Sequence, residues 1–220
     1  MSDKFNKIYN QSINYPEKFW KEASEDIFWF KKPNKILNKS NPPFYKWYED
    51  GVTNTCYNAL DFHIDQGKGN KTALIYDSPI TGNKSKFTFE ELRSKVSKFA
   101  GALKDQGVNK GDRVIIYMPM IPEAVVAMLA CARIGAIHSV VFGGFASNEL
   151  ASRIDDSKAK LLVTASCGFE PGRTVEYKPL VDEAIKQANH KINKMILFQR
   201  KGHEVKLNAP MEISWDEVIA

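Results

Sequence analysis

Residues 113–142 read RVIIYMPMIPEAVVAMLACARIGAIHSVVF, and they decide the fold of this chain. Arg113 to Tyr117 is rich in β-branched residues, which favours a strand, and Met118-Pro119 ends it. Pro122 to Gly135 is apolar nearly all round, so it predicts a helix that is buried on most sides. Ile137 to Phe142 is again a strand pattern. A strand, a helix and a strand in this order predict a parallel βαβ unit.

The same alternation continues on both sides of this unit. Thr72 to Tyr76 predicts a strand, and Thr88 with Glu91 three residues later forms a capping box at the start of a helix that Gly107 closes. The remaining expected elements are a helix at 147–155, a strand at 161–165, a helix at 179–188 and a strand at 194–198. Strands that alternate with helices predict a mainly parallel sheet with helices on both faces. The predicted fold class is α/β.

The first sixty or so residues have a different composition. They contain three of the four tryptophans, and Pro16, Pro33, Pro42 and Pro43 interrupt any long element. We therefore expect short helices joined by irregular segments, with aromatic side chains that this stretch cannot bury alone. The predicted domains are an N-terminal cap at 1–62 and the first part of a larger α/β domain at 63–220.

Charge and composition exclude several classes of protein. The formal net charge of +5 is spread along all 220 residues, which argues against nucleic acid as a partner. No apolar run approaches the roughly 20 residues needed to cross a bilayer, so no membrane partner is expected. Three scattered cysteines predict neither disulfides nor a zinc site. The acidic, apolar-poor N-terminus argues against a targeting peptide, and we expect a cytoplasmic protein of undetermined oligomeric state.

Ligands of open α/β sheets bind beyond the carboxyl ends of the strands. This rule directs attention to the loops that follow Tyr117, Val141 and Ala165. In the second of these loops, the backbone N–H groups of Phe142-Gly143-Gly144-Phe145 could approach a nucleotide while the rings stack on a base. The alternative is a tight turn that needs a positive φ at one glycine. No G-x-G-x-x-G motif follows any strand, which disfavours a nicotinamide-dependent dehydrogenase.

The third loop contains Glu170-Pro171-Gly172-Arg173. A Pro-Gly turn that presents an arginine at the carboxyl edge of a sheet suits a phosphate, because the guanidinium offers paired donors in one plane. A solvated surface turn explains the same residues equally well.

Other polar segments predict no chemistry. Thr81-Gly82-Asn83-Lys84 lacks the spacing of a phosphate-binding P-loop and favours a hairpin turn. The four histidines have no partner at the spacing of a metal site or a proton relay. We assign no catalytic residue and no metal ligand.

Taken together, these segments resemble the acetyl- and propionyl-CoA synthetases of the adenylate-forming, AMP-binding superfamily. The motifs that carry the resemblance are Pro16-Glu17-Lys18-Phe19-Trp20, Tyr57-Asn58-Ala59-Leu60-Asp61, Tyr117-Met118-Pro119-Met120-Ile121-Pro122-Glu123 and, most specifically, Val141-Phe142-Gly143-Gly144-Phe145. The likeness runs over essentially the whole chain.

The resemblance implies an acid–thiol ligase that joins a carboxylate to ATP, releases pyrophosphate and transfers the acyl group to CoA. It implies that the segment Glu170 to Arg173 contacts the phosphates of CoA and that Phe142, Gly143 and Gly144 lie against its adenosine end. Acetyl-type members have arginine at both ends of the first segment, whereas this chain has Glu170 at the first place. The ATP loop, the Mg-dependent chemistry and the catalytic lysine lie beyond Ala220 in the family, so we expect a truncated, inactive chain.

Ala146, Arg153-Ile154-Asp155-Asp156 and the Glu170 segment look more like propionyl- than acetyl-CoA synthetases. Propionate is therefore the expected acid, with acetate as the alternative. These residues also leave open a hypothesis of another class. The chain could be a stand-alone CoA-binding or interaction module that reuses half an enzyme fold.

Overall fold

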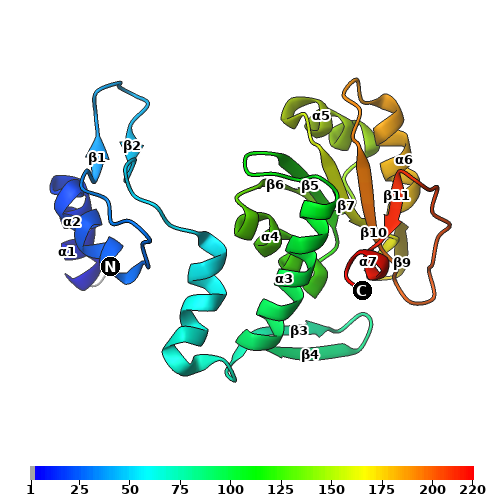
Figure 1. Cartoon of the computed structure of the whole chain (residues 1–220), viewed down its shortest axis with the longest axis horizontal. Helices are drawn as coiled ribbons and strands as arrows, with labels where there is room; N and C mark the ends of the chain where they lie inside the picture. Colours follow the sequence, from blue (N-terminus) through cyan, green and yellow to red (C-terminus); the bar gives the residue numbers. More distant parts are fainter. Residues whose placement is uncertain (1–2) are drawn as a thin grey trace. The chain divides into compact units, whose positions relative to one another are not determined.

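The computed structural model describes residues 3–220, which divide after Asn58 into two compact units (Figure 1). The first unit begins with α1 (Asp3–Asn14) and α2 (Pro16–Ala23), followed by the short 3-10 helix Ser24–Asp26. Pro16 occupies the first turn of α2, where its missing N–H costs no hydrogen bond. Strands β1 (Leu37–Asn38) and β2 (Lys46–Trp47) pair antiparallel. Short elements were expected here, and the structure confirms them.

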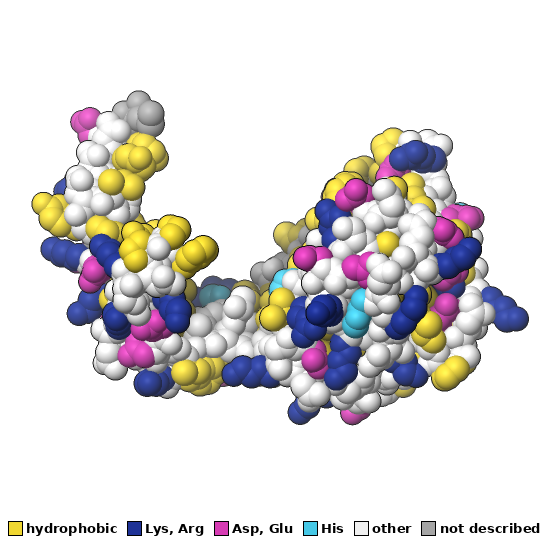
Figure 2. Space-filling model, turned by 90° about the horizontal axis from the view of Figure 1, so that it is seen from above, with side chains coloured by type: hydrophobic (Ala, Val, Ile, Leu, Met, Phe, Trp, Pro, Cys, Tyr) yellow, Lys and Arg dark blue, Asp and Glu magenta, His cyan; other side chains and the backbone are white. Residues whose placement is uncertain are grey.

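The first unit exposes many of its large apolar side chains. Trp20 and Trp47 meet edge to face with ring centroids 6.1 Å apart, yet each ring is more than 40% exposed. Figure 2 shows such side chains standing out in yellow between lysines. The exposed set also contains Phe5, Ile8, Tyr9, Ile13, Tyr15, Ile27, Phe30, Phe44, Tyr45 and Val52. As expected from its composition, this segment does not bury its aromatic residues by itself.

The second unit is built on a five-stranded sheet in which all neighbouring strands are parallel. Its spatial order is β11-β10-β7-β5-β6. The bounds are β5 (Arg113–Met118), β6 (Ile137–Phe142), β7 (Leu161–Ala165), β10 (Lys194–Phe198) and β11 (Glu212–Ser214). The α/β class with a parallel sheet is therefore confirmed, and β6, β7 and β10 have the predicted bounds.

Helices cover both faces of this sheet (Figure 1). They are α3 (Phe89–Asp105), α4 (Pro122–Ile134), α5 (Ser147–Ser157), α6 (Tyr177–Gln187) and the short α7 (Trp215–Val218). The chain moves from β5 to β6 in one direction across the sheet and from β6 to β7 in the other. Because such crossovers are right-handed, α4 lies on one face, with α3 packed against it, and α5 and α6 lie on the other.

Two hairpins and the irregular helical turn Ile64–Lys68 complete the unit. A similar turn, Tyr57–Asp61, begins in the first unit and ends in the second. Strands β3 (Thr72–Ser78) and β4 (Asn83–Thr88) form the hairpin expected around Thr81-Gly82. Strands β8 (Cys167–Glu170) and β9 (Arg173–Glu176) form a second hairpin with Pro171 and Gly172 at its tip. The sequence had indicated only a turn there, because runs of four residues are too short for a period-2 pattern to stand out.

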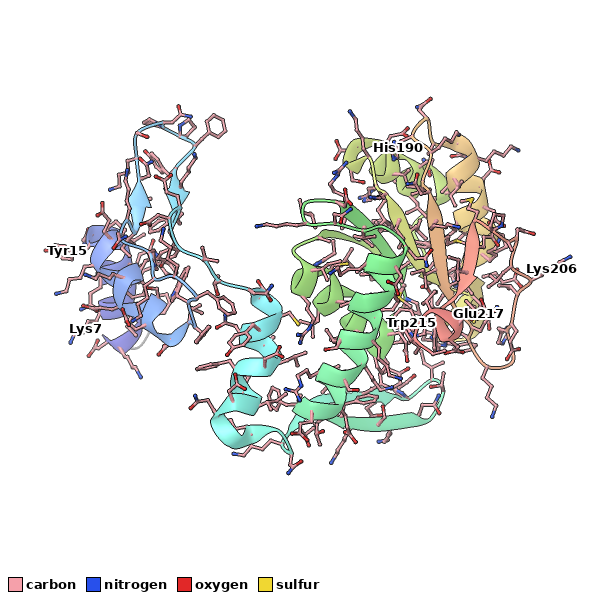
Figure 3. All side chains as sticks on the ribbon, in the orientation of Figure 1. Lys7, Tyr15, His190, Lys206, Trp215 and Glu217 are labelled. Atoms are coloured by element: carbon pink, nitrogen blue, oxygen red, sulfur yellow. The ribbon has the colours of Figure 1, made fainter. Side chains whose placement is uncertain are left out.

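The core lies on both faces of the buried strands. On one face, Ile115, Tyr117 and Leu162 pack with residues of α5 and α6. The ring of Trp215 on α7 (labelled in Figure 3) stacks on Phe99 of α3 with centroids 3.9 Å apart. The capping box of α3 is confirmed, since the Thr88 hydroxyl accepts from Glu91 N–H and the Glu91 carboxylate accepts from Thr88 N–H. Burial of both faces is typical of a parallel sheet.

An ion pair ties α6 to the edge strand β11. Lys178 Nζ lies 3.0 Å from the Glu212 carboxylate and 2.6 Å from Asp182. The side chains of Lys178 and Glu212 are only 8% and 6% exposed. Removing one partner of such a pair leaves a buried charge without compensation.

We expect Lys178→Met to lower the free energy of unfolding by about 3 kcal/mol, because Glu212 then stays buried without its cation. The double variant Lys178→Met, Glu212→Gln removes both charges and is expected to recover part of this loss. Urea unfolding followed by circular dichroism measures both. Equal stability of the single variant and the unmodified protein would show that the pair contributes nothing.

Candidate functional site

The carboxyl ends of four parallel strands meet around one cavity of about 330 Å³, which we call the edge hollow. Its lining comes from residues 76–81 of the β3–β4 hairpin, 118–121 after β5, 140–143 at the end of β6, and 168–170 of β8, together with Tyr177 and Arg200. After β5 the chain enters a helix on one face of the sheet, and after β7 it reaches a helix on the other. Such a switch point between adjacent strands is where open α/β sheets bind ligands.

The loop after β6 is held by a side chain from the end of β5. The Tyr117 hydroxyl donates to the carbonyl oxygen of Phe145 at 2.8 Å and accepts from the N–H of Gly144 at 3.2 Å. Burial raises the pKa of Tyr117, so the hydroxyl keeps its proton at neutral pH and can donate. Gly144 has a φ of +99°, a conformation that a residue with a Cβ seldom adopts. The tight-turn interpretation of this glycine is thus correct, and it is compatible with a binding role.

Two glycines make room for a second tyrosine. A Cβ on Gly143 would lie 2.2 Å from the Tyr177 hydroxyl, and a Cβ on Gly168 would lie 2.6 Å from the same oxygen. The ring of Tyr177 also packs against Tyr117, with centroids 5.0 Å apart. Burial, followed by the neighbouring Tyr117 and Glu170, raises the pKa of Tyr177 to about 12. The loops after β6 and β7 therefore approach each other across a protonated phenol.

The hairpin of β8 and β9 places Glu170 at the edge hollow and Arg173 outside its lining. Glu170 Oε1 lies 3.6 Å from the position of a Cβ on Gly144, so the two predicted segments are neighbours in space. The Arg173 guanidinium donates to Glu170 Oε2 at 2.7 Å, and its side chain is 71% exposed. Arg173 thus neutralises the carboxylate beside the hollow.

The predicted site residues fall into two groups. Phe142, Gly143 and Glu170 line the edge hollow, and the Phe142 ring is 68% exposed. Gly144, Pro171, Gly172 and Arg173 belong to the same two loops but lie outside the lining. The ligand-binding role of all seven stays a prediction.

Sequence reasoning missed three residues of this region: Tyr117, Tyr177 and Arg200. Tyr117 ends a predicted strand, and Tyr177 stands two residues before the helix predicted at 179–188, so neither position carries a signal of its own. Arg200 follows β10, a fourth strand, whereas the predicted binding loops follow β5, β6 and β7. One signal was available, because Arg200 is one of only six arginines and stands two residues beyond a predicted strand.

Comparison with known proteins identifies the fold family. Residues 62–216 match the sequence model of the AMP-binding enzymes. This chain belongs to the AMP-binding enzyme family. Residues 5–59 match the model of the acetyl-coenzyme A synthetase N-terminus. The resemblance inferred from the motifs is thereby confirmed.

Individual relatives point to short-chain synthetases. The chain is 53% identical over 210 residues to acyl-CoA synthetase short-chain family member 3, mitochondrial, of Homo sapiens, covering 95% of this chain and 31% of the relative. It is 45% identical over 202 residues to the acetyl-coenzyme A synthetase of Streptomyces avermitilis, covering 92% of this chain and 31% of that protein. The chain therefore spans about a third of the length of these AMP-binding enzymes.

A solved structure agrees in fold. The acetoacetyl-CoA synthetase from Streptomyces lividans matches with a TM-score of 0.84 at 24% identity, over 96% of this chain and 32% of that one. Within residues 3–220, no helix is long and apolar enough to cross a membrane. The cytoplasmic location stays a prediction, since the human relative is named mitochondrial.

We expect Gly143→Ala to lower the free energy of unfolding by about 1–3 kcal/mol, because its Cβ collides with the Tyr177 hydroxyl. Adding Tyr177→Phe removes the hydroxyl and is expected to restore part of the stability. Gly101→Ala is the matched control: nothing lies within 4 Å of a Cβ there, and α3 gains about 0.5–1 kcal/mol in helix preference. If Gly143→Ala is as stable as the unmodified protein in urea unfolding, the close approach of the two loops is wrong.

Proposed function

We propose that this chain forms the N-terminal part of a short-chain acyl-CoA synthetase, an acid–thiol ligase that converts propionate, ATP and CoA into propionyl-CoA, AMP and pyrophosphate. The observation that carries the proposal is the 53% identity, over nearly the whole chain, to a short-chain acyl-CoA synthetase. The edge hollow adds geometric support, because the two loops that would contact CoA flank it together.

The reaction proceeds in two steps that assign separate tasks to separate parts of the enzyme. A carboxylate oxygen of the acid attacks the α-phosphorus of ATP, and pyrophosphate leaves. The thiolate of CoA then attacks the acyl carbonyl of the adenylate, and AMP leaves. The residues of this chain serve the second step: the loop at Phe142 to Gly144 supports the adenosine end of CoA, and the segment Glu170 to Arg173 lies near its phosphates.

The chemistry of ATP is assigned to the remainder of the enzyme. Magnesium neutralises the phosphates of ATP in adenylate-forming reactions. In residues 3–220 no group of three or more His, Cys, Asp or Glu side chains is placed to hold a metal ion. That the magnesium ligands and the catalytic residues lie elsewhere in the enzyme is part of the proposal. Under this proposal, residues 1–62 are the cap domain and residues 63–220 are the first part of the AMP-binding domain, working in the cytoplasm.

Exposed apolar surface on the sheet supports a larger parent protein. Strand β6 lies at one edge of the sheet, and Ile137 and Val140 on it are each more than half exposed. Parallel sheets are normally covered on both faces, and an exposed apolar edge strand invites aggregation. We propose that further chain covers β6 in the complete synthetase.

Propionate is proposed over acetate on the basis of the sequence resemblance. Ala146 and Glu170 are the residues that the resemblance associates with propionyl-type enzymes, and it implies arginine in place of Glu170 in acetyl-type enzymes. Relatives named acetyl-coenzyme A synthetase keep acetate as the alternative. The edge hollow consists entirely of residues from the second unit, which supports a second candidate, a CoA-binding module that acts without catalysis.

The complete gene product that carries this sequence is expected to release pyrophosphate in a propionate-dependent reaction with ATP, and to have a higher kcat/KM for propionate than for acetate. The 220-residue chain alone is expected to release none, because the ATP-binding residues are elsewhere. Activity of the short chain would contradict this division of tasks. Inactivity of the complete protein, together with cooperative unfolding and CoA binding by the short chain in calorimetry, would favour the binding module.

The roles of Glu170 and Arg173 are separable in the complete enzyme. Glu170→Gln removes a negative charge near the phosphates and is expected to lower the KM for CoA by about threefold. Arg173→Ala is expected to raise it by about three- to tenfold while adenylate formation changes little. The double variant distinguishes the causes: if Arg173 contacts CoA directly, Arg173→Ala still raises the KM when residue 170 is Gln. If CoA dependence is unchanged in every variant, neither residue belongs to the site.

A further inference from the structure

Arg200 is a nearly buried arginine in the wall of the edge hollow. Arg200 follows β10 by two positions, and only 8% of its surface is exposed. Its N–H donates to the Ser166 hydroxyl at 2.8 Å, and its carbonyl accepts from the N–H of His203 at 2.9 Å. These bonds hold the backbone of Arg200 at the carboxyl edge of the sheet, next to the end of β7.

Within residues 3–220, the guanidinium of Arg200 forms no ion pair. No carboxylate in residues 3–220 lies within ion-pair distance of its guanidinium, which stacks instead over the ring of Phe169 at 4.7 Å. Arg133 differs, since it pairs with Asp61, and Arg153 pairs with Glu149. Stacking orients the guanidinium plane but leaves its N–H donors to be satisfied. A nearly buried cation without a counter-charge is costly, and an anionic ligand would compensate it.

The charge balance of the hollow favours such an anion. Its lining contains three charged side chains: Asp77, Glu170 and Arg200. Asp77 has its own cation in Lys84 at 2.8 Å, and Glu170 has Arg173 at 2.7 Å. Both acids are therefore neutralised from outside the hollow. Glu123 on α4 is outside the lining, and the charge of Arg200 opposes the rise that burial causes in the pKa of Glu123, but the two form no ion pair. Among the charged residues of the lining, Arg200 is thus the one without an ion-pair partner.

We infer that Arg200 binds a phosphate group of the nucleotide half of CoA. The inference rests on the proposed function, which makes CoA the second substrate, and it adds a residue that neither the loop at Phe142 nor the Glu170 segment contains. The stacked guanidinium offers a fork of donors that suits a phosphate, and the exposed ring of Phe142 lines the same hollow and can stack on a base. Arg200 thus anchors the phosphate from the wall of the hollow, while Arg173 acts from its rim.

The experiment uses the complete gene product with three substitutions: Arg200→Gln, Arg200→Lys and, as a matched control, Lys201→Gln. Lys201 is the next residue, is exposed and lies outside the lining. Lys201→Gln therefore removes one positive charge, as Arg200→Gln does, without changing the hollow. Two readouts are compared: the KM for CoA in thioester formation, and the propionate-dependent exchange of pyrophosphate into ATP, which requires no CoA. Urea unfolding of each variant checks that it is folded.

Arg200→Gln is expected to raise the KM for CoA at least about tenfold, and Arg200→Lys by about threefold, because an ammonium keeps the charge but loses the planar fork. The exchange reaction, its KM for ATP and the Lys201→Gln variant are expected to stay within about twofold of the unmodified enzyme. Repeating the titration with 3′-dephospho-CoA identifies the phosphate: the penalty disappears if Arg200 binds the 3′-phosphate and persists if it binds the pyrophosphate.

An unchanged KM for CoA in Arg200→Gln would overturn the inference while leaving the proposed function intact. Equal losses in exchange and thioester formation would also overturn it, because they would place Arg200 in the support of the fold or of ATP. If the unmodified protein shows no exchange, the proposed function fails instead. Arg200 is then judged by calorimetry with CoA on the same variants, where equal affinity of Arg200→Gln and unmodified protein refutes its role.

Discussion

The parallel pairing of β5 between β6 and β7 is the constraint on which the rest of this structure depends. Parallel strands need crossover helices, and right-handed crossovers in opposite directions place α4 on one face and α5 on the other. The same arrangement points the carboxyl ends of β5, β6, β7 and β10 toward one edge. The edge hollow is therefore a consequence of strand order, and its lining residues, from Tyr76 to Arg200, come from parts of the chain more than a hundred residues apart.

Tyr117 shows how packing and site are connected. Its ring belongs to the core beside α5 and α6, while its hydroxyl fixes the loop that follows the neighbouring strand. Tyr177, at the start of α6, fills the space between the loops after β6 and β7, and both loops have glycine where the phenol approaches. The shape of the hollow is thus set by two aromatic residues whose hydroxyls stay protonated and whose rings are part of the hydrophobic core.

Electrostatics sort the charged residues of the hollow into paired and unpaired groups. Glu170 has its counter-charge in Arg173, at the exposed tip of the hairpin. Exposed pairs of this kind contribute little binding energy, because water screens both charges. Arg200 is only 8% exposed and is stacked on Phe169, so we expect the same guanidinium chemistry to have a larger effect at that position. Both residues are arginines, and the difference between them is their burial.

The sequence by itself determined the α/β class, the bounds of β6, β7 and β10, the capping box of α3 and three of the loops at the carboxyl edge of the sheet. These features follow from local periodicity, from turn chemistry and from motifs such as Val141 to Phe145. Only the tertiary structure decided that Glu170 faces Gly144, that Arg173 is paired and exposed, and that Arg200 joins the hollow from a fourth strand. The physical reason is that strand order and side-chain burial arise from contacts between segments that are distant in the sequence. Local periodicity does not indicate which strands become neighbours.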